Sequence, residues 1–548
     1  MKRIQYALLL LCTLGITSCS DFLNEEPQTS VRKEGVYSSL SSAKASLAGC
    51  YAIMSGYDGY AFNYFHVLSV SSGMGVSLKT NDVNLTTMNI LPSDVNMSKM
   101  YDGLSQTINS ANDIIDGMKN SPIEESERKR ITGEAHFIRA VSYFNLVRLF
   151  GKVSLVLEPV TSYTEAQVPR CDVQQVYDAI ISDLTNAYEL LPLPATKIAG
   201  HPHKYAAQAL LAKVYLTLAG NEEGSPYWQK AYNAAKDVYD NGGYKLVRPY
   251  ANLFGSPNKN NVESIFEIQF SSAVNSGRLT ETTFPVGHSL MSNIVSEGKS
   301  WGKTRPTQRA FSQFDEGDPR RDASFVYAKY TNIFVTGADK KDIMLYPTKK
   351  ADATKLKLTY KLGDSEYPAW KKYYDPTMTA SASSANFVYY RYADLLLVLA
   401  EAANEIGSAD ASTYLNEVLD RARDANGDGM ISVAEVYPLP VSETEKASKA
   451  LFRERVFRER LKELTGECDE WYTIRRRGTD YLRKIMEEHN THVNNWYVSQ
   501  KLNPANVKFV YTYEVTDQSV RKNLLMPFPA DEITRNENIS QEDQNYGY

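Results

Sequence analysis

Apolar and small residues recur every three or four positions along eight segments of the chain, which is the period of an amphipathic α-helix. Short turns with Pro or Gly, such as 191–194, join these segments into pairs. Ala231 and Ala235 follow the spacing of tetratricopeptide units, in which small side chains let neighbouring helices approach closely. The periods are irregular, so we expect about four degenerate units. The predicted helices cover residues 107–118, 131–150, 173–191, 205–218, 228–239, 392–406, 411–423 and 445–464.

Long stretches between these helices lack the helical period. Residues 55–95 are rich in Gly, Asn, Ser and Tyr, whereas 262–269 read as a strand. Long loops in a compact protein commonly carry function or pack on a scaffold. No linker indicates a domain boundary. We therefore expect a helical scaffold over about 105–240 and 390–466, with a loop-rich ligand-binding part over about 55–105 and 262–380.

The composition is that of an ordinary folded protein, with 43% hydrophobic and 23% charged residues in 548. A mean hydropathy of -0.39 and the lack of a long apolar run after the N-terminus exclude a multi-pass membrane protein. Lys and Arg number 60 against 65 Asp and Glu, so nucleic-acid binding has no electrostatic basis. Tyrosine is unusually frequent at 37 residues. Its flat ring and hydroxyl suit core packing as well as sugar or peptide recognition.

The N-terminus has the pattern of an export signal. Lys2 and Arg3 precede a short apolar run over 7–16, which is too short to span a bilayer. The sequence Ile-Thr-Ser-Cys that ends at Cys19 then resembles a lipobox, so residues 1–18 are predicted to be a lipoprotein signal peptide. Several acyl chains on Cys19 would give stable membrane anchoring. The alternative is a secreted protein with a coincidental Cys at the cleavage site.

One segment matches a calcium-binding pattern. Residues 424–435 fit D-x-[DN]-x-[DN]-G-x5-E at every specified position. Gly429 permits the sharp turn, and Ile431 takes the apolar position that packs such a loop inward. Pro438 shortens the following helix, so we expect a lone structural Ca²⁺ loop, with a plain Asx-Gly turn as the alternative. The expected ligands are Asp424, Asn426, Asp428, Met430 through its carbonyl, Ser432 and Glu435.

Aromatic and amide side chains gather in two non-helical stretches. Sugars bind through flat aromatic faces and through planar amide or carboxylate hydrogen bonds. Trp301 lies in a stretch without helical or strand pattern, where ligand or transporter contact is expected. For the tyrosine cluster, core packing stays open as the alternative. The candidate ligand-binding residues are Tyr57, Tyr60, Phe62, Tyr64, Asn81, Asp82 and Trp301.

Catalytic motifs are missing from the sequence. There is no HExxH and no G-x-S-x-G, and the GKS and GKT triplets at 298–304 lack the earlier glycine of a phosphate loop. A helical glycoside hydrolase stays open, because the spacing of its two carboxylates is spatial and the chain has 65 acidic residues. No residue is singled out as catalytic.

Ten motifs in order carry a family resemblance. GEAHFIRAVSYFNLVRLFGKVSLVLEPV at 133–160 closely resembles the signature helix of the SusD/RagB family of outer-membrane nutrient-binding lipoproteins. SCSDFLNEEP, HKYAAQALLAKVYLTLAG, YYRYADLLLVLAEAANEIG and RERLKELTGECDEWYTIRRRG resemble other family segments, and LLMPFPADEITRNENISQEDQNYGY resembles the family's C-terminus. The resemblance covers almost the whole chain. The family usually passes quickly from the helix before 424 to the ERxxEL helix, whereas this chain inserts the calcium-loop pattern there.

The resemblance implies a single SusD-like domain over 19–548 with an all-α dominated fold of irregular TPR-like helix pairs, on which loops and small strands pack. It implies a lipid-anchored protein of the outer membrane that faces the cell exterior. Such proteins are binding proteins, not enzymes: they capture oligo- or polysaccharide, or in some members peptides, for a SusC-like TonB-dependent transporter. The family motifs are expected to be scaffold, in which charge-assisted hydrogen bonds of Arg139, Arg148, Arg391, Asp394 and Glu401 join helices.

Overall fold

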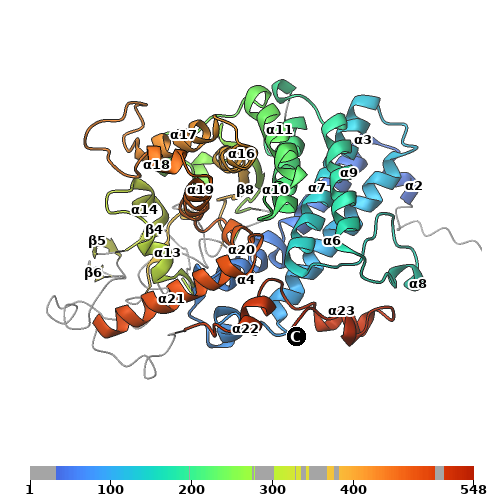
Figure 1. Cartoon of the computed structure of the whole chain (residues 1–548). Coiled ribbons are helices and arrows are strands. Elements are labelled where there is room, and N and C mark those ends of the chain that lie inside the picture. The colour runs from blue at the N-terminus through green and yellow to red at the C-terminus, as the bar shows by residue number, and fades with distance from the viewer. Residues whose placement is uncertain are drawn as a thin grey trace, which may run out of the picture.

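Helices dominate the protein in this computed structural model, as Figure 1 shows. The predicted all-α dominated fold, with few short strands, is confirmed. Cys19 and Trp301 lie outside the residues that the structure describes. The structure describes residues 33–196, 198–273, 277, 302–327, 329–334, 341–344, 367–375, 382–499 and 511–548.

Eight helices form the scaffold: each of the first six packs on the next one in this order, and the eighth packs on the sixth. In Figure 1 they run from the blue-green helices on the right to the orange helices on the upper left. Seven of the eight helix predictions are confirmed, with several helices extending beyond the expected ends. The scaffold consists of α6 (Val95–Met118), α7 (Glu125–Phe150), α9 (Val173–Leu190), α10 (Lys204–Ala219), α11 (Pro226–Asn241), α16 (Tyr392–Ile406), α17 (Ala411–Arg423) and α19 (Lys449–Glu463).

Local sequence explains where these helices begin and which face they bury. The buried residues of α9 include Ile180, Leu184 and Ala187, which are spaced three and four apart. Asp172 closes a capping box at its N-terminus, satisfying amides that have no partner inside the helix. Ala231 and Ala235 are fully buried where α11 meets α10, as the predicted close approach requires.

The predicted helix over 445–464 is divided in two. Residues Glu443–Lys446 form α18, and α19 starts afresh at Lys449. The Ser448 side chain accepts a hydrogen bond from the Leu451 amide and so caps α19. The apolar period continues across the break, which is why periodicity alone does not detect it.

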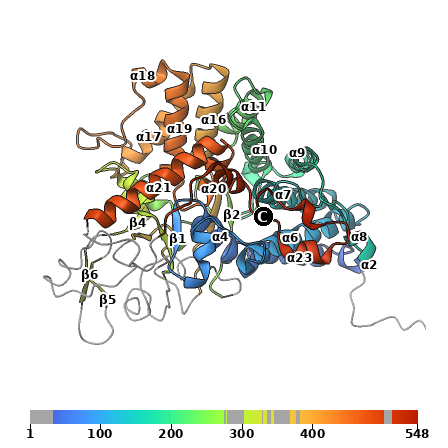
Figure 2. The ribbon, with the colours of Figure 1, turned by 60° about the horizontal axis from the view of Figure 1, so that its bottom comes forward.

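The prediction that residues 55–95 are irregular is wrong for most of that stretch. Every residue of α4 is buried, so this helix has no polar face and shows no amphipathic period. Figure 2 shows α4 beside β1, on the opposite side of α20 and α21 from the α16–α19 helices. The stretch holds η2 (Tyr57–Ala61), α4 (Asn63–Ser71), β1 (Gly75–Ser77), η3 (Thr80–Asp82) and α5 (Val83–Thr86).

The described strands form antiparallel pairs. The strand expected at 262–269 is present as β2 (Ser264–Ile268). Gly75 lies opposite Pro306 and Ser77 opposite Thr304, so β1 and β3 join parts of the chain that are far apart in sequence. The pairs are β1 with β3 (Thr304–Pro306), β2 with β8 (Phe387–Arg391), β4 (Phe325–Val326) with β7 (Ala369–Trp370), and β5 (Lys329–Phe334) with β6 (Lys341–Met344).

The remaining helices complete the described part of the chain. They are α2 (Lys33–Val36), α3 (Leu40–Met54), α8 (Tyr163–Ala166), η4 (Pro194–Thr196), η5 (Tyr250–Asn252), η6 (Ser256–Asn258), α13 (Gln308–Ser312), α14 (Pro319–Ser324), α20 (Asp469–Arg475), α21 (Thr479–Ser499), α22 (Asp517–Lys522), α23 (Ala530–Arg535) and η8 (Gln541–Asp543). No described helix is both long enough and apolar enough to cross a membrane. Cys50, Cys171 and Cys468 are free thiols.

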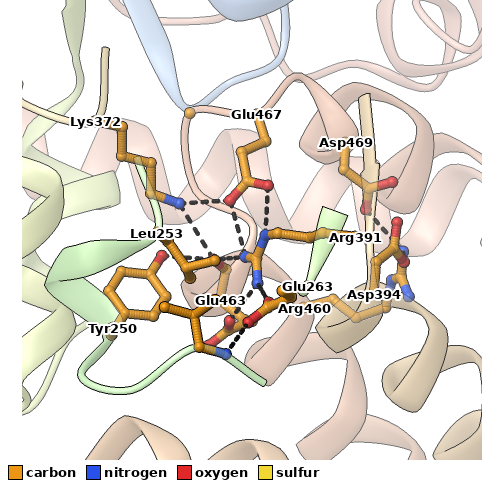
Figure 3. Close-up of polar contacts among 12 residues, drawn as sticks. Tyr250, Leu253, Glu263, Lys372, Arg391, Asp394, Arg460, Glu463, Glu467 and Asp469 are labelled. Carbon is orange, nitrogen blue, oxygen red and sulfur yellow. Dashed lines mark hydrogen bonds and ion pairs between the residues drawn. The ribbon is translucent and has the colours of Figure 1, made fainter. Parts of the chain in front are cut away.

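A network of buried charges joins β8 to the segment after α19. The Arg391 guanidinium donates to both carboxylate oxygens of Glu467, at 2.8 and 2.9 Å, and to one of Glu463 at 2.7 Å. Lys372 reaches Glu467 at 2.6 Å, and Figure 3 shows these side chains converging. Burial alone would raise the pKa of Glu463, but neighbouring guanidinium groups hold it far below its ordinary value. The buried carboxylates therefore stay charged and paired.

Other charged residues of the family motifs also join helices. Asp394 contacts Lys213 and Arg460, at 2.5 and 2.7 Å. Glu401 binds the guanidinium groups of two consecutive arginines after α20, and Arg139 binds Asp183 of α9. Arg148 differs from the expectation: its guanidinium stacks on the Tyr472 ring, 3.5 Å from the centroid, and donates within its own helix.

Candidate functional site

A row of stacked rings leads from the surface into the core at η2 and α4. Tyr57 is 52% exposed and stacks on Phe62, with ring centroids 4.7 Å apart. Phe62 stacks in turn on His66 at 5.0 Å. Gly59 makes this turn possible, because a Cβ there would lie 2.2 Å from the Met54 carbonyl oxygen. Of the predicted aromatic ligand residues that the structure describes, only Tyr57 is therefore exposed, and the Phe62 ring packs beneath it.

Tyr60 and Tyr64 belong to the core and not to the surface. Both side chains are buried, and the Tyr64 hydroxyl lies 3.1 Å from that of Tyr472. Asn145 of α7 bonds both tyrosine hydroxyls. Their rings face inward because η2 and α4 wrap around this amide, so the structure supports core packing for these two residues and gives them no access to a ligand.

A surface cavity of about 700 Å³ opens beside this row. Three asparagine side chains line it, and Lys79 connects it to the stacked rings, since its ammonium lies 4.9 Å from the Phe62 centroid. Leu91 and Val95 are exposed at the cavity and offer apolar contact. We call this cavity the amide pocket. It is lined by Leu78, Lys79, Thr80, Asn81, Asp82, Asn84, Leu91, Ser93, Asp94, Val95, Asn96 and Lys303.

Buried hydrogen bonds fix the floor of the amide pocket. His66 contacts Asp82 at 2.9 Å through one ring nitrogen and Thr304 at 2.9 Å through the other. Ser77 donates to the same Asp82 carboxylate at 2.6 Å. Burial alone would raise the pKa of Asp82, but the hydrogen bonds from His66 and Ser77 lower it below its ordinary value. The charged carboxylate thus ties η3 to α4, β1 and β3.

Thr304, His66 and Asp82 are hydrogen bonded in the order of a nucleophile, a base and an acid, but these three residues are closed to solvent. Thr304 and His66 are both fully buried. A hydroxyl without access to substrate cannot act as a nucleophile. These three residues instead hold the floor of the amide pocket in place. Asp82 is itself only 5% exposed. Of the two predicted polar ligand residues, only Asn81 is exposed at the pocket.

The start of α6 forms another wall. Asp94 accepts a hydrogen bond from the Met97 amide at 2.9 Å and caps this 24-residue helix. Burial raises the pKa of Asp94 above its ordinary value. Asn96 and Val95 follow directly on the pocket wall. An exposed ring, amides, hydroxyls and two lysines in one place can hold a ligand with a C–H face and many hydroxyl groups.

Sequence reasoning identified part of the amide pocket and missed the rest. Asn84, Asn96, Lys79 and Lys303 were not singled out, although they line the same cavity. They come from different elements, and their meeting depends on the packing of α5, α6 and the start of β3. The high density of Asn and Asp over 81–96 is the one local signal that could have extended the prediction.

The calcium-loop pattern folds into a set of turns bonded to its own backbone. Asp424 accepts hydrogen bonds from the Gly427 and Gly429 amides at 2.8 and 3.0 Å, and it pairs with Arg248 at 2.5 Å. Glu435 accepts a hydrogen bond from the Ser432 amide at 2.8 Å. Across the described parts of the chain, no three His, Cys, Asp or Glu residues gather as a metal site. Calcium binding stays a prediction.

The other expected ligands of the loop face solvent. The Asn426 side chain accepts a hydrogen bond from the Asp428 amide at 3.0 Å. The Asp428 carboxylate accepts one from the Met430 amide at 2.8 Å. Ile431, expected to pack inward, is 42% exposed, because the chain from 431 to 442 forms no helix that could cover it. The prediction for Ile431 is therefore wrong.

Two family models cover most of the chain. Residues 209–548 match the model described as the SusD family. Residues 21–216 match one described as "Starch-binding associating with outer membrane". A curated relative, SusD-like protein P2 of Formosa agariphila, is 27% identical over 99% of both chains.

Solved structures share the fold. A SusD homologue from Bacteroides thetaiotaomicron superposes with a TM-score of 0.76 at 20% identity, covering 96% of this chain and 100% of its own. A structure described as a laminarin binding SusD-like protein has a TM-score of 0.66 at 23% identity, covering 93% of this chain and 99% of its own. At these identities the likeness concerns the fold.

Proposed function

Because this chain belongs to the SusD family, we propose that it binds an oligo- or polysaccharide at the cell surface and delivers it to a SusC-like TonB-dependent transporter. The amide pocket with its stacked rings is the observation that carries the proposal. Tyr57 offers an exposed face of the kind on which a pyranose ring stacks, and Asn81, Asn84 and Asn96 offer amides for its hydroxyl groups. The laminarin-binding neighbour supports glycan as the ligand class.

The proposed role is binding without catalysis. The stacked rings and the amides offer contacts to a ligand. Thr304 and His66, which resemble a nucleophile and its base, are enclosed. Cys19 is proposed as the lipid-bearing residue that anchors the protein to the outer membrane, facing the exterior. The description of the second family model, which names outer-membrane association, supports this location. Peptide capture is the second candidate, because the family resemblance implies it as the alternative to glycan binding.

A glycan panel on the lipid-free chain from Ser20 onward tests the proposal. Calorimetry with laminarin and other polysaccharides should give binding that weakens about tenfold in Tyr57→Ala and in Asn84→Ala, because a stacking face or a hydrogen bond is lost. Tyr163→Ala is the matched control, since Tyr163 is 64% exposed on α8 and lies outside the pocket.

Three other outcomes would change the proposed site, the ligand class or the binding role. Binding that survives both Tyr57→Ala and Asn84→Ala would keep the function and discard the site. Binding of oligopeptides without any glycan response would replace the glycan proposal by peptide capture. Release of reducing sugar on incubation with a bound polysaccharide would show a hydrolase and contradict a pure binding role.

A further inference from the structure

The ionisable side chains that line the amide pocket are two lysines and two aspartates. Strand pairing brings the two lysines to the same wall. Ser77 of β1 lies opposite Thr304 of β3, and one step further along the Leu78 amide donates to the Lys303 carbonyl at 2.8 Å. Lys79 follows directly on the β1 side. Both lysines therefore enter the pocket from the same end of this two-stranded sheet.

The two aspartates of the pocket are engaged by the protein itself. Asp82 is 5% exposed, and its carboxylate accepts hydrogen bonds from His66 and Ser77. Asp94 accepts a hydrogen bond from the Met97 amide and caps α6. Both carboxylates thus serve to hold η3 and α6 in place.

The Lys79 ammonium has no acidic partner. Among the residues that the structure describes, no carboxylate forms an ion pair with it. Its near neighbour is the Phe62 ring, whose centroid lies 4.9 Å away. An aromatic ring attracts a cation but does not neutralise its charge. Lys99 of α6, by contrast, pairs with Asp58 at 3.3 Å.

An uncompensated ammonium favours one class of ligand over another. A neutral sugar that covered the pocket would remove water from Lys79 without supplying a counter-ion, which costs free energy. An acidic sugar would supply the counter-ion. The whole chain has a formal net charge of -5, so it has no general attraction for polyanions. Selective binding of an acidic ligand therefore requires a local positive site of this kind.

From this arrangement we infer that the amide pocket selects an acidic glycan, whose carboxylate or sulfate ester pairs with Lys79. Tyr57 and Lys79 both contact the Phe62 ring, at 4.7 and 4.9 Å from its centroid. A sugar ring stacked on Tyr57 and an acidic group at Lys79 can therefore belong to one short oligosaccharide. Asn81 and Asn84 bond its hydroxyl groups. The inference rests on the proposed glycan binding and narrows its ligand class.

The test compares acidic glycans with neutral counterparts that differ only in the acidic group. The probes are polygalacturonate and alginate, each beside its carboxyl-reduced form, and carrageenan beside its desulfated form. Isothermal titration uses the lipid-free chain from Ser20 onward in calcium-free buffer of low ionic strength. At least one acidic glycan should bind about fivefold or more tightly than its counterpart, because a charge-assisted hydrogen bond is gained. The preference should shrink at about 0.5 M salt, where exposed charges are screened.

Variants of Lys79 assign the preference to the pocket. Lys79→Gln should reduce it below about twofold, whereas Lys79→Arg keeps the charge and should keep most of the preference. Lys129→Gln is the matched control, since Lys129 is 53% exposed, does not line the pocket and carries the same charge. Its preference should equal that of the unmodified chain.

Different results would overturn the inference and the proposed function. Neutral glycans that bind as tightly as every acidic counterpart would discard the acidic class and leave the proposed function standing. Silence toward all six polysaccharides and toward laminarin would reject both. A preference that persists in natively folded Lys79→Gln, or that is lost equally in Lys129→Gln, would show that the acidic group is not recognised by Lys79.

Discussion

Arg391 shows how a single side chain holds several elements together. Its guanidinium is almost fully buried and bonds Glu263, Glu463 and Glu467, which come from the residue before β2, from α19 and from the turn that follows α19. A buried charge is stable only while its partners remain, because the low-dielectric interior penalises an unpaired ion. At this scale the family motifs are a scaffold, and Tyr57 is a proposed ligand-binding residue whose side chain is exposed.

Arg391→Met is expected to reduce the free energy of unfolding by about 3–5 kcal/mol, since it leaves buried carboxylates without their cation. Denaturant unfolding followed by circular dichroism measures the change. Arg535→Met is the control, because that side chain is 63% exposed and its ion pairs lie at 3.8 Å. A loss below about 1 kcal/mol for Arg391→Met would contradict the role given to the network.

At the scale of elements, α21 packs on the scaffold through an apolar face that includes Leu482 and Ile485, and ion pairs add to this attachment. Glu488 of α21 accepts hydrogen bonds from Arg309 of α13 at 2.7 Å and from Arg458 of α19 at 2.6 Å. Burial alone would raise the pKa of Glu488, but these two arginines outweigh it and lower the pKa to about 2. The carboxylate therefore favours the docked helix at neutral pH.

The docking of α21 is expected to weaken in acid. The Glu488 pKa is lower in the folded protein than its ordinary 4.5, so its contribution is complete above about 4.5 and is lost as the pH falls toward about 2. Hydrogen exchange of the α21 amides should rise over that window. Glu488→Gln removes the titrating group. If this variant shows the same acid-dependent rise in exchange, Glu488 is not the group responsible.

The loop after α17 is the element whose ligand is untested, and we propose that it binds Ca²⁺ weakly. The pattern at 424–435 supports this, whereas Arg248 competes for Asp424. Titration should give a dissociation constant of about 10⁻⁴–10⁻³ M, tighter in Arg248→Ala and lost in Glu435→Gln. Glu443→Gln, on the neighbouring α18, is the control. No heat from either the unmodified chain or Arg248→Ala would reject calcium.

At the scale of the molecule, the C-terminal segment closes the scaffold next to the amide pocket. The Met526 amide donates to the Leu149 carbonyl of α7 at 2.8 Å, and the Ala530 amide donates to the Pro92 carbonyl at 2.9 Å. Figure 1 shows this red segment beneath the helices of the N-terminal half. One apolar core draws residues from Tyr37 to Ile539, so the first and last described segments pack together with the scaffold.

Attachment to the membrane is predicted to depend on one residue. Cys19→Ser removes the thiol that lipidation requires, so the full chain expressed in its outer membrane should lose incorporated fatty acid and leave the membrane fraction. Metabolic labelling with palmitate, followed by fractionation, measures both effects. Cys12→Ser is the matched control within the same leader. Labelling that persists in the Cys19→Ser variant would exclude Cys19 as the lipidation site.

By itself, the sequence determined the helix pairs, the strand at β2 and the family, because these follow from local periodicity and ordered motifs. Only the tertiary structure decided which ring of 57–64 is exposed, since Tyr60 and Tyr64 are buried by partners such as Asn145 from a distant helix. It also decided that Lys79, Asn84 and Lys303 share a pocket with Asn81. A local pattern reports the period of one segment, whereas burial and pocket membership depend on residues that meet only after folding.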